Sequence, residues 1–307
     1  MDTIVKVTLI KNDTIRPDSV WQTLDSLFTY WETHFSQTST QSEILPINLR
    51  EKDTVAVSPI VAEMVTAALA YGDTLEGMFD LTIFPLKELW GFGEKSAKLH
   101  IPSQQQIDSV LERIGNLGVR VHNDSILIFS DSTVTIDVGG IAKGFVLREA
   151  AQLLDKKGIK NYLISAGGDI IGRGTRSDGK PWLVGIQHPR VRKNMLATVR
   201  LSNASVVTSG DYERFYIQDS IRYHHIFNPR TGRSCRTNQS LTIRTGNPIV
   251  ADVLSTGLFC LHPDSILAFV ESRPEVECLG VDSLGNVFVS DGWCEQLNFT
   301  DTTISCR

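Results

Sequence analysis

The segment VADVLSTGLFCL, residues 250–261, carries three side-chain oxygens on one face of an expected helix. Asp252, Ser255 and Thr256 stand at positions i, i+3 and i+4 near the start of that helix, a spacing that brings side chains together. Mg2+ takes oxygen ligands and usually completes its octahedral shell with water and substrate phosphates. Capping of the helix by Asp252, beside two small polar residues, would give the same pattern. A metal site and a helix cap are therefore both open.

Two histidines precede a turn-forming cluster, NPRTG, at residues 228–232. His224 and His225 lie at the end of an expected strand. Because neighbouring strand residues point to opposite faces, only one of the two can address a given site. An imidazole can take a proton from a hydroxyl nucleophile at neutral pH, although a lone histidine in such a place is more often structural.

A glycine loop in IDVGGIAKG, residues 136–144, is suited to bind phosphate. A strand is expected to end at Asp137, and two glycines then let the backbone approach a ligand closely. The helix that follows would direct free amides at that ligand, and Lys143, about one turn into it, would add a positive charge. A tight strand-to-helix connection with a surface lysine is the alternative.

Two further glycine loops show the same ambiguity between ligand binding and turn formation. Ser165, Gly167 and Gly168 of SAGGD offer backbone amides after a buried strand. Ser209 and Gly210 of TSGDYERF have a similar setting. Together with GMFDLTIFPLKELWGFG, residues 77–93, we interpret these loops as one ligand site assembled from distant segments.

The elements that would position these loops have recognisable patterns and end signals. Residues 17–33 form an amphipathic helix with a bulky stripe that includes Trp21, Ser58 opens a second helix that fades before Gly77, and Ser103 caps a third. A fourth helix is expected from about residue 141 to 154. Strands are expected at 125–130, 133–137, 162–166, 182–187, 197–201 and 215–227, with a hairpin over 278–290. This order indicates an α+β fold rather than regular βαβ alternation.

The composition is that of an ordinary soluble protein. The chain has 307 residues, 41% of them hydrophobic, and a formal charge of -5 without a basic block, which argues against a nucleic-acid binder. Walker A, G-x-S-x-G and H-E-x-x-H motifs are missing, as is G-x-G-x-x-G after a strand. The first residues lack the features of a signal peptide and no stretch of about 18 apolar residues occurs, so we expect a soluble chain. A removed export signal or lipid anchor remains open.

The five cysteines are too widely spaced for a zinc site, and their odd number does not indicate a full disulfide framework. Cys260 lies in an apolar helical run and is expected in the core. Cys294 and Cys306 could pair in an oxidising compartment.

Six segments together resemble the ApbE family, the FAD:protein FMN transferases. The family segments look like GAFDPTVGPLVNLWGFG, DLGGIAKGYA, SAGGD followed by a tryptophan strand, TSGDYER, HIIDPRTG and ADALATALF, and all six have counterparts here in that order, within residues 42–261. The resemblance implies one ApbE-like domain over residues 1–307, which two subdomains could share. The implied fold is α+β, with antiparallel-rich sheets, flanking helices and a ligand cleft between two parts of the chain.

The resemblance also implies roles for individual residues. His225 matches the catalytic base of the family. The metal-binding positions are Gly140, through its carbonyl, and Asp252, Ser255 and Thr256. The flavin-binding positions, with the loop residues that we assign to the same site, are Met78, Phe79, Asp80, Asp137, Lys143, Ser165, Gly167, Gly168, Ser209, Gly210 and Ile226.

The implied activity splits FAD with the help of Mg2+ and moves FMN onto a threonine or serine hydroxyl of an acceptor flavoprotein, with release of AMP. The acceptor would carry a Ser/Thr-Gly-Ala-Ser/Thr motif and be a membrane redox complex subunit or a periplasmic flavoprotein. The chain would be a bacterial monomer or homodimer, on the periplasmic side of the inner membrane if a signal was removed, and otherwise cytoplasmic. A metal-dependent FAD pyrophosphatase and a non-enzymatic flavin-binding protein are the alternatives.

Departures from the family segments concern the flavin pocket more than the metal or the histidine. Thr38 stands where an aromatic residue commonly helps to hold the flavin. The other departures are Pro46 and Ile47 for Arg-Phe, Leu81 and Phe84 for Pro and Gly, and Asn228 for Asp.

Overall fold

The computed structural model describes residues 4–10, 17–93, 99–301 and 304. The chain divides into two compact units. Unit 1 contains Thr29–Ala142 and Glu213–Cys235, and unit 2 contains Asp2–Phe28, Lys143–Tyr212 and Arg236–Arg307. Each unit is therefore assembled from segments that are distant in the sequence.

Unit 2 is built on a seven-stranded sheet in which every neighbouring pair of strands is antiparallel. In spatial order the strands are β1 (Val5–Leu9), β5 (Tyr162–Ala166), β6 (Asp169–Arg173), β9 (Ala204–Gly210), β14 (Asn238–Thr245), β15 (Val276–Asp282) and β16 (Val287–Val289). The order shows that most strand partners come from distant segments, so the sheet depends on long-range pairing.

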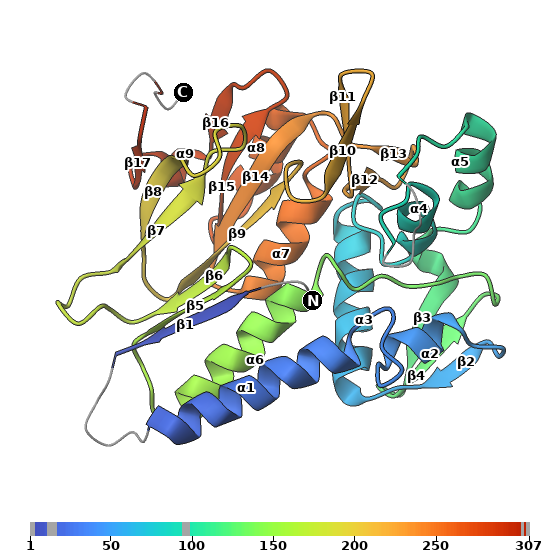
Figure 1. Ribbon diagram of the computed structural model, residues 1–307, viewed down its shortest axis with the longest axis horizontal. Helices are drawn as coiled ribbons and strands as arrows, with labels where there is room; N and C mark the ends of the chain where they lie inside the picture. The colour runs from blue at the N-terminus through green and yellow to red at the C-terminus, as the bar shows by residue number, and fades with distance from the viewer. Residues whose placement is uncertain (1–3, 11–16, 94–98, 302–303, 305–307) are drawn as a thin grey trace. The chain divides into compact units, whose positions relative to one another are not determined.

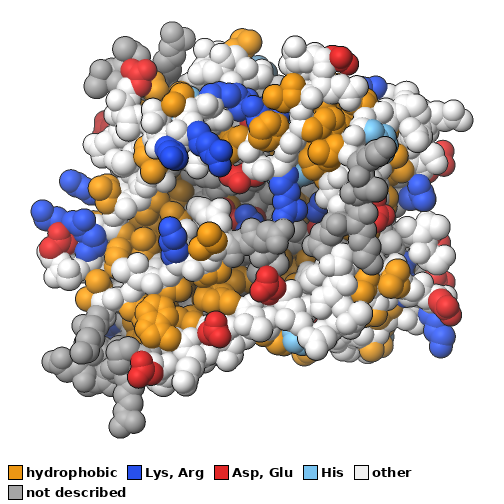
Figure 2. All heavy atoms as spheres, viewed as in Figure 1, with side chains coloured by type: hydrophobic (Ala, Val, Ile, Leu, Met, Phe, Trp, Pro, Cys, Tyr) orange, Lys and Arg blue, Asp and Glu red, His pale blue; other side chains and the backbone are white. Residues whose placement is uncertain are grey.

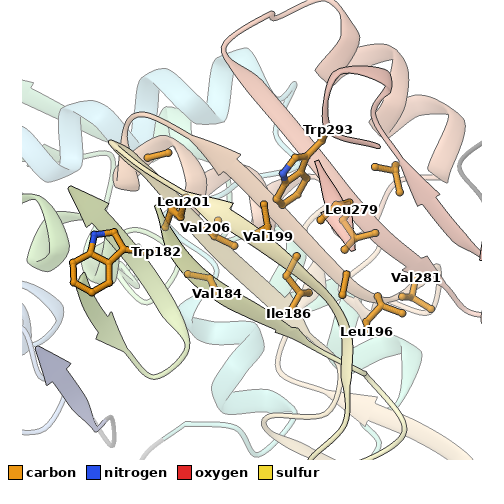
Figure 3. Packing of buried hydrophobic residues seen from close by; sticks show 14 residues of the cluster. Trp182, Val184, Ile186, Leu196, Val199, Leu201, Val206, Leu279, Val281 and Trp293 are labelled. Carbon is orange, nitrogen blue, oxygen red and sulfur yellow. The ribbon is translucent and has the colours of Figure 1, made fainter. Parts of the chain in front are cut away.

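One face of this sheet is covered by a second sheet of three strands, β7 (Trp182–Gln187), β8 (Met195–Leu201) and β17 (Leu297–Phe299). Figure 3 shows the apolar side chains between them, among them Trp182, Val206 and Trp293. Alternate residues of β7 are buried, as expected for a strand with one face toward a core and the other toward solvent.

Helices cover the opposite face of the seven-stranded sheet (Figure 1). They are the unit 2 part of α1 (Pro17–His34), α6 (Ala142–Lys156) and α7 (Pro248–Gly257). Leu24, Leu147 and Ile164 pack together in a core between α1, α6 and β5. Helix α7 packs on β9 and β14, α8 (Pro263–Glu271) packs on β15, and α9 (Asp291–Cys294) lies just after β16. Unit 2 thus has three layers: helices, large sheet and small sheet.

Unit 1 combines short helices with three small antiparallel sheets. The helices are α2 (Ile44–Asn48), α3 (Pro59–Thr74), α4 (Phe84–Leu89), α5 (Gln104–Leu111) and the 3-10 helix Asn116–Gly118. The strands are β2 (Thr54–Ala56), β3 (Val119–His122), β4 (Ile126–Phe129), the hairpin β10 (Phe215–Gln218) and β11 (Ile221–His224), and the pair β12 (Phe227–Asn228) and β13 (Arg233–Ser234). Trp90, Tyr223 and Phe227 form part of an aromatic core that joins α4 to these strands.

The predicted α+β class and the antiparallel sheets are confirmed. Helix caps were also predictable: the Ser58 side chain caps α3, and Ser103 and Gln106 form a reciprocal capping box on α5. In the view of Figure 2, basic and acidic side chains are both spread over the surface, in keeping with the near balance of 30 and 35 such residues.

The predicted strand at 133–137 is wrong, because its backbone bonds to the Asn48 side chain and to a single loop carbonyl instead of a neighbouring strand. Asn48 Oδ1 accepts from the Ile136 N–H at 2.8 Å, and Asn48 Nδ2 donates to the Ile136 carbonyl at 2.8 Å. The Asp137 N–H donates to the Leu81 carbonyl at 2.7 Å. Trp21 also departs from its predicted place in the buried stripe of α1, since its side chain is 43% exposed.

The cysteines differ from expectation too. Helix α7 ends at Gly257, so Cys260 lies beyond it in a half-buried turn, and it is disulfide-bonded, as are Cys235 and Cys294. Cys306, the expected partner of Cys294, lies outside the described residues. Cys278 is a buried free thiol, and burial is the main cause that raises its pKa to about 12.

Within the residues that the structure describes, the helices are all too short or too polar to cross a lipid bilayer.

Trp293 provides a test of how the core of unit 2 is packed. Its side chain is fully buried, and its Nε1–H finds no acceptor among the described residues. A buried donor without a partner costs about 1–3 kcal/mol, so Trp293→Phe should leave the free energy of unfolding within about 1 kcal/mol of wild type. Trp293→Ala should cost about 3–5 kcal/mol through the cavity it leaves. Urea unfolding measures both.

The matched control is Trp182→Phe in the same core. Its Nε1–H donates to the Arg173 carbonyl at 2.9 Å, so this change breaks a hydrogen bond and should destabilise more than Trp293→Phe. Equal losses for the two phenylalanine variants would contradict the unsatisfied state of Trp293.

Candidate active site

Asp252 occupies the middle of α7 and its carboxylate reaches the start of α6. The helix begins at Pro248 and is capped by Asn247, whose side chain accepts from the Ile249 N–H at 3.0 Å. The three oxygen-bearing residues thus lie in the middle and last turn of the helix, not near its start. Asp252 Oδ2 accepts from the Gly144 N–H at 2.8 Å, so Asp252 caps α6 and not its own helix.

Close packing of α6 on α7 makes this contact reachable. A Cβ added to Gly144 would lie 2.6 Å from Ile249 Cα and 2.7 Å from the Pro248 carbonyl oxygen, so a larger residue would push the two helices apart. The final glycine of IDVGGIAKG is therefore a packing requirement that brings amides of α6 to Asp252.

Three charged groups share the buried end of α6. Lys143 Nζ forms an ion pair with Asp169, the first residue of β6, whose side chain is 2% exposed. Burial raises the pKa of Asp252 to about 7, the positive charge of Lys143 opposes this rise, and the negative charge of Asp169 adds to it. Burial likewise raises the pKa of Asp169, against the effect of Lys143. Two buried carboxylates beside one ammonium leave a deficit of positive charge that a bound cation would relieve.

Hydroxyl groups lie on the same helix and on the neighbouring strand. Ser209 Oγ of β9 is 3.0 Å from Ser255 Oγ and 3.3 Å from Thr256 Oγ1. Ser255 Oγ also donates to the Asp252 carbonyl at 2.9 Å. One carboxylate and a group of hydroxyls form a hard-oxygen donor set, so these residues fit a magnesium ion that takes further ligands from a substrate. The described residues hold no group of three or more His, Cys, Asp and Glu that would bind a metal by themselves.

The SAGGD loop is a two-residue hairpin turn between β5 and β6. Gly167 and Gly168 have φ of 62° and 98°, as a type I′ turn requires, and Ala166 pairs with Asp169 across it. The Gly167 N–H donates to the Ile4 carbonyl at 3.1 Å, so one amide of the expected anion nest is already used. The turn places Asp169, which the sequence analysis did not single out, against Lys143.

In unit 1, Asp137 is buried and forms an ion pair with Lys87 of α4. Its Oδ1 also accepts from the Gly139 N–H at 2.8 Å. Burial would raise the pKa of Asp137, but Lys87, this hydrogen bond and His225 together bring it below its ordinary value. The sequence analysis did not predict a role for Lys87, because no motif position corresponds to a lysine there. Gly140 also belongs to unit 1, three residues after Asp137.

The two histidines have separate roles. His224 is buried, its Nε2 donates to the Cys235 carbonyl at 2.6 Å and its Nδ1 accepts from the Ile226 N–H, so this ring supports the backbone. His225 Nδ1 lies 3.3 Å from the Arg214 carbonyl, which assigns the proton to Nδ1 and leaves Nε2 as an acceptor. Strand β11 ends at His224, so His225 lies just beyond the strand and the expected alternation of neighbouring strand residues does not extend to it.

The electrostatic surroundings keep His225 neutral. Desolvation, the positive charge of Lys87 and the charges of His224 and Arg214 lower its pKa to about 3. A neutral imidazole with a free Nε2 can accept a proton from a hydroxyl group.

The first glycine-rich segment holds its residues by local hydrogen bonds. Asp80 Oδ1 accepts from the Thr82 N–H at 2.7 Å and from the Thr82 hydroxyl at 2.6 Å, and burial raises the pKa of Asp80. The side chains of Met78, Phe79 and Ile226 are 7%, 5% and 6% exposed. Met78, Phe79 and Ile226 are therefore core residues in this structure.

The raised pKa of Asp252 generates a stability prediction for the metal-free protein. The folded state holds the Asp252 proton more tightly than the unfolded state. Ionisation of Asp252 therefore lowers the free energy of unfolding, and this loss is absent below about pH 3.8 and grows as the pH rises toward 7. Asp252→Asn should increase the free energy of unfolding by roughly 1–3 kcal/mol at pH 8 in EDTA, with the gain shrinking toward pH 4. Urea unfolding at both pH values measures this.

The control for this change is Asp25→Asn, on an exposed position of α1, which should shift the free energy of unfolding by less than about 0.5 kcal/mol at either pH. A loss of stability in Asp252→Asn at pH 8 would contradict the unfavourable burial of this charge.

His225 gives a prediction on protonation. Because its folded-state pKa lies near 3, its ring should stay neutral from pH 5 to 8, and the chemical shift of its Cε1 proton should not titrate in that range. NMR spectra of wild type, assigned by the signal lost in His225→Gln, measure this. A titration midpoint near 6.5 would show that Lys87 and burial do not act on the ring as the geometry indicates.

Comparison with known proteins finds curated relatives that carry the name FAD:protein FMN transferase. The curated FAD:protein FMN transferase of Escherichia coli K12 is 34% identical over 213 residues, which cover 68% of this chain and 61% of that protein. The chain therefore spans about three fifths of the length of that relative. The FAD:protein FMN transferase of Vibrio cholerae is 28% identical over 277 residues, or 89% of this chain and 83% of that protein.

Solved structures agree in fold. The crystal structure of the ApbE protein of Thermotoga maritima superposes with a TM-score of 0.87 at 30% identity, over 94% of this chain and 95% of that one. The flavin transferase ApbE from Vibrio cholerae gives a TM-score of 0.86 at 26% identity, over 95% of both chains. The model of the ApbE family matches residues 1–280. The chain belongs to the ApbE family.

Proposed function

We propose that this chain is a magnesium-dependent FAD:protein FMN transferase. The observation that carries the proposal is the buried Asp252, which lies among hydroxyl groups at the amide end of α6 in unit 2. The proposal is also supported by a neutral His225 in unit 1, whose Nε2 has no hydrogen-bond partner among the described residues. Membership of the ApbE family and the names of the relatives support FAD as the donor and a protein as the acceptor of FMN.

Asp252, Thr256, Ser255 and the Gly140 carbonyl would hold Mg2+, as the resemblance implies. When bound, the ion would neutralise charge on the pyrophosphate of FAD and on the departing phosphate. Ser209, which bonds to Ser255 and Thr256, would fix the orientation of their hydroxyls. Asp169 would hold Lys143 at the start of α6, where its ammonium offsets phosphate charge.

His225 would act as the base in the transfer. Its Nε2 accepts the proton of a serine or threonine hydroxyl of the acceptor, and that oxygen attacks the phosphorus on the FMN side of the pyrophosphate. The bond from this phosphorus to the bridging oxygen breaks, the bridging oxygen leaves with AMP, and FMN stays on the acceptor as a phosphoester. The Arg214 carbonyl holds the Nδ1–H, so the ring keeps one tautomer through the cycle.

Flavin binding is proposed at the positions that the resemblance implies. These are Met78, Phe79, Asp80, Asp137, Lys143 and Ile226. The loop residues Ser165, Gly167, Gly168, Ser209 and Gly210 are proposed for the same ligand.

The acceptor is proposed to be a flavoprotein with a Ser/Thr-Gly-Ala-Ser/Thr motif that works outside the cytoplasm. Three disulfide-bonded cysteines, Cys235, Cys260 and Cys294, support this compartment, because disulfides persist in oxidising environments and are rare in the reducing cytosol.

Intact-mass analysis of an acceptor fragment tests the proposal. After incubation with the protein, FAD and Mg2+, the fragment should gain the mass of one FMN residue, and EDTA or Asp252→Ala should abolish the gain, whereas Asp25→Asn should not. Free FMN and AMP with an unmodified fragment would identify a pyrophosphatase instead. Intact FAD in every sample would refute both the transferase and the pyrophosphatase activity.

The role of His225 has its own test. His225→Gln should lower the transfer rate by about 10²–10⁴-fold and leave the FAD dissociation constant within about threefold of wild type. Stopped assays of FMN transfer and fluorescence titration of FAD measure the two quantities. An equal loss of binding and transfer would make His225 a structural residue.

A further inference from the structure

Lys87 of α4 is a half-buried cation to which the sequence analysis gave no role. Its side chain is 17% exposed and pairs with Asp137, whose side chain is 5% exposed. A largely buried ammonium in contact with a proposed flavin-binding carboxylate calls for a role.

The surrounding backbone holds this ion pair in place. The Lys87 carbonyl accepts from the Phe92 N–H at 2.8 Å and from the Gly93 N–H at 3.2 Å, which anchors the end of α4. Asp137 is held by the Leu81 carbonyl through its own N–H. A Cβ at Gly139 would lie 2.9 Å from Asp137 Oδ1 and 3.5 Å from Lys87 Nζ, so the glycine keeps the space around the pair open.

Each oxygen of the Asp137 carboxylate has one partner in the pair and its loop. Oδ2 contacts Lys87 Nζ, and Oδ1 accepts from the Gly139 N–H at 2.8 Å. A carboxylate oxygen offers two lone-pair positions, so each oxygen keeps the capacity to accept one more hydrogen bond. An ionised carboxylate has no proton to donate, so it recognises only N–H or O–H groups of a ligand.

Without Lys87, burial would work against the ionised form. Desolvation alone raises the pKa of Asp137, and the contact with Lys87 is the main influence that reverses this. Protonation would turn one oxygen of Asp137 into an O–H donor and would remove the negative charge that strengthens hydrogen bonds from a ligand N–H.

We propose that Lys87 is a positioning residue for flavin binding, which holds Asp137 as a hydrogen-bond acceptor for an N–H or O–H group of FAD. This inference rests on the proposed function, in which Asp137 contacts FAD. FAD carries such donors in the ring imide, the ribityl hydroxyls and the adenine amine. Lys87 acts through Asp137 and not by touching the flavin.

The experiment is a double-mutant cycle on FAD affinity, measured by fluorescence titration of the full chain in EDTA at pH 7. Lys87→Val removes the cation, Asp137→Asn removes the charge of its partner, and a third variant combines the two changes. Lys87→Val should weaken FAD binding by about 10–100-fold. If Lys87 acts through Asp137, adding Lys87→Val to Asp137→Asn should cost less than about threefold more.

Two controls separate positioning from folding. Lys87→Arg keeps the cation and should bind FAD within about threefold of wild type, and Lys52→Val changes an exposed lysine of the same unit and should bind as wild type does. Thermal unfolding identifies variants that are not folded. If Lys87→Val does not fold, Lys87→Gln takes its place in the cycle.

The outcomes are distinct. Wild-type affinity in a folded Lys87→Val or Lys87→Gln variant overturns the inference while the proposed function stands. Additive losses in the cycle, or a loss that Lys87→Arg does not rescue, overturn the action through Asp137. A wild-type protein that does not bind FAD refutes the proposed function itself.

Discussion

The contact between the Asp252 carboxylate and the amide end of α6 is the interaction on which the arrangement of unit 2 depends. It joins the middle of one helix to the start of another, and it requires Gly144 so that the two helices can approach. The N-terminal end of α6 carries partial positive charge, which stabilises an anion there. The contact offsets part of the cost of burying this carboxylate, although burial still leaves the pKa of Asp252 raised.

The large sheet of unit 2 brings the other charged and hydroxyl groups to the same place. Asp169 opens β6 directly after the glycine turn, and Ser209 lies near the end of β9, the neighbouring strand. Helix α7 packs on β9, so Ser209 reaches the hydroxyls in its last turn. The sheet therefore fixes the spacing of groups that lie far apart in the sequence.

The sequence predicted what local signals control. Ser58 and Ser103 mark helix starts because capping depends on the next three residues. Strand partners depend on distant segments, so the order of the large sheet could not be deduced. Ile136 was placed in a strand because its neighbours alternate, but Asn48, 88 residues earlier, supplies the hydrogen bonds. Lys87 and Asp169 escaped notice because only the tertiary structure supplies their partners.

The buried thiol of Cys278 has a consequence for oxidative folding. Thiol–disulfide exchange needs a thiolate, and a pKa of about 12 leaves roughly one ionised thiol in ten thousand at pH 8. The Cys278 side chain is fully buried in β15, and its N–H donates to Ser290 Oγ at 2.9 Å, so this strand must separate before the sulfur meets another cysteine. Once β15 has joined the sheet, the odd cysteine can no longer attack the disulfides that Cys235, Cys260 and Cys294 form, and scrambling becomes limited by the rate of unfolding.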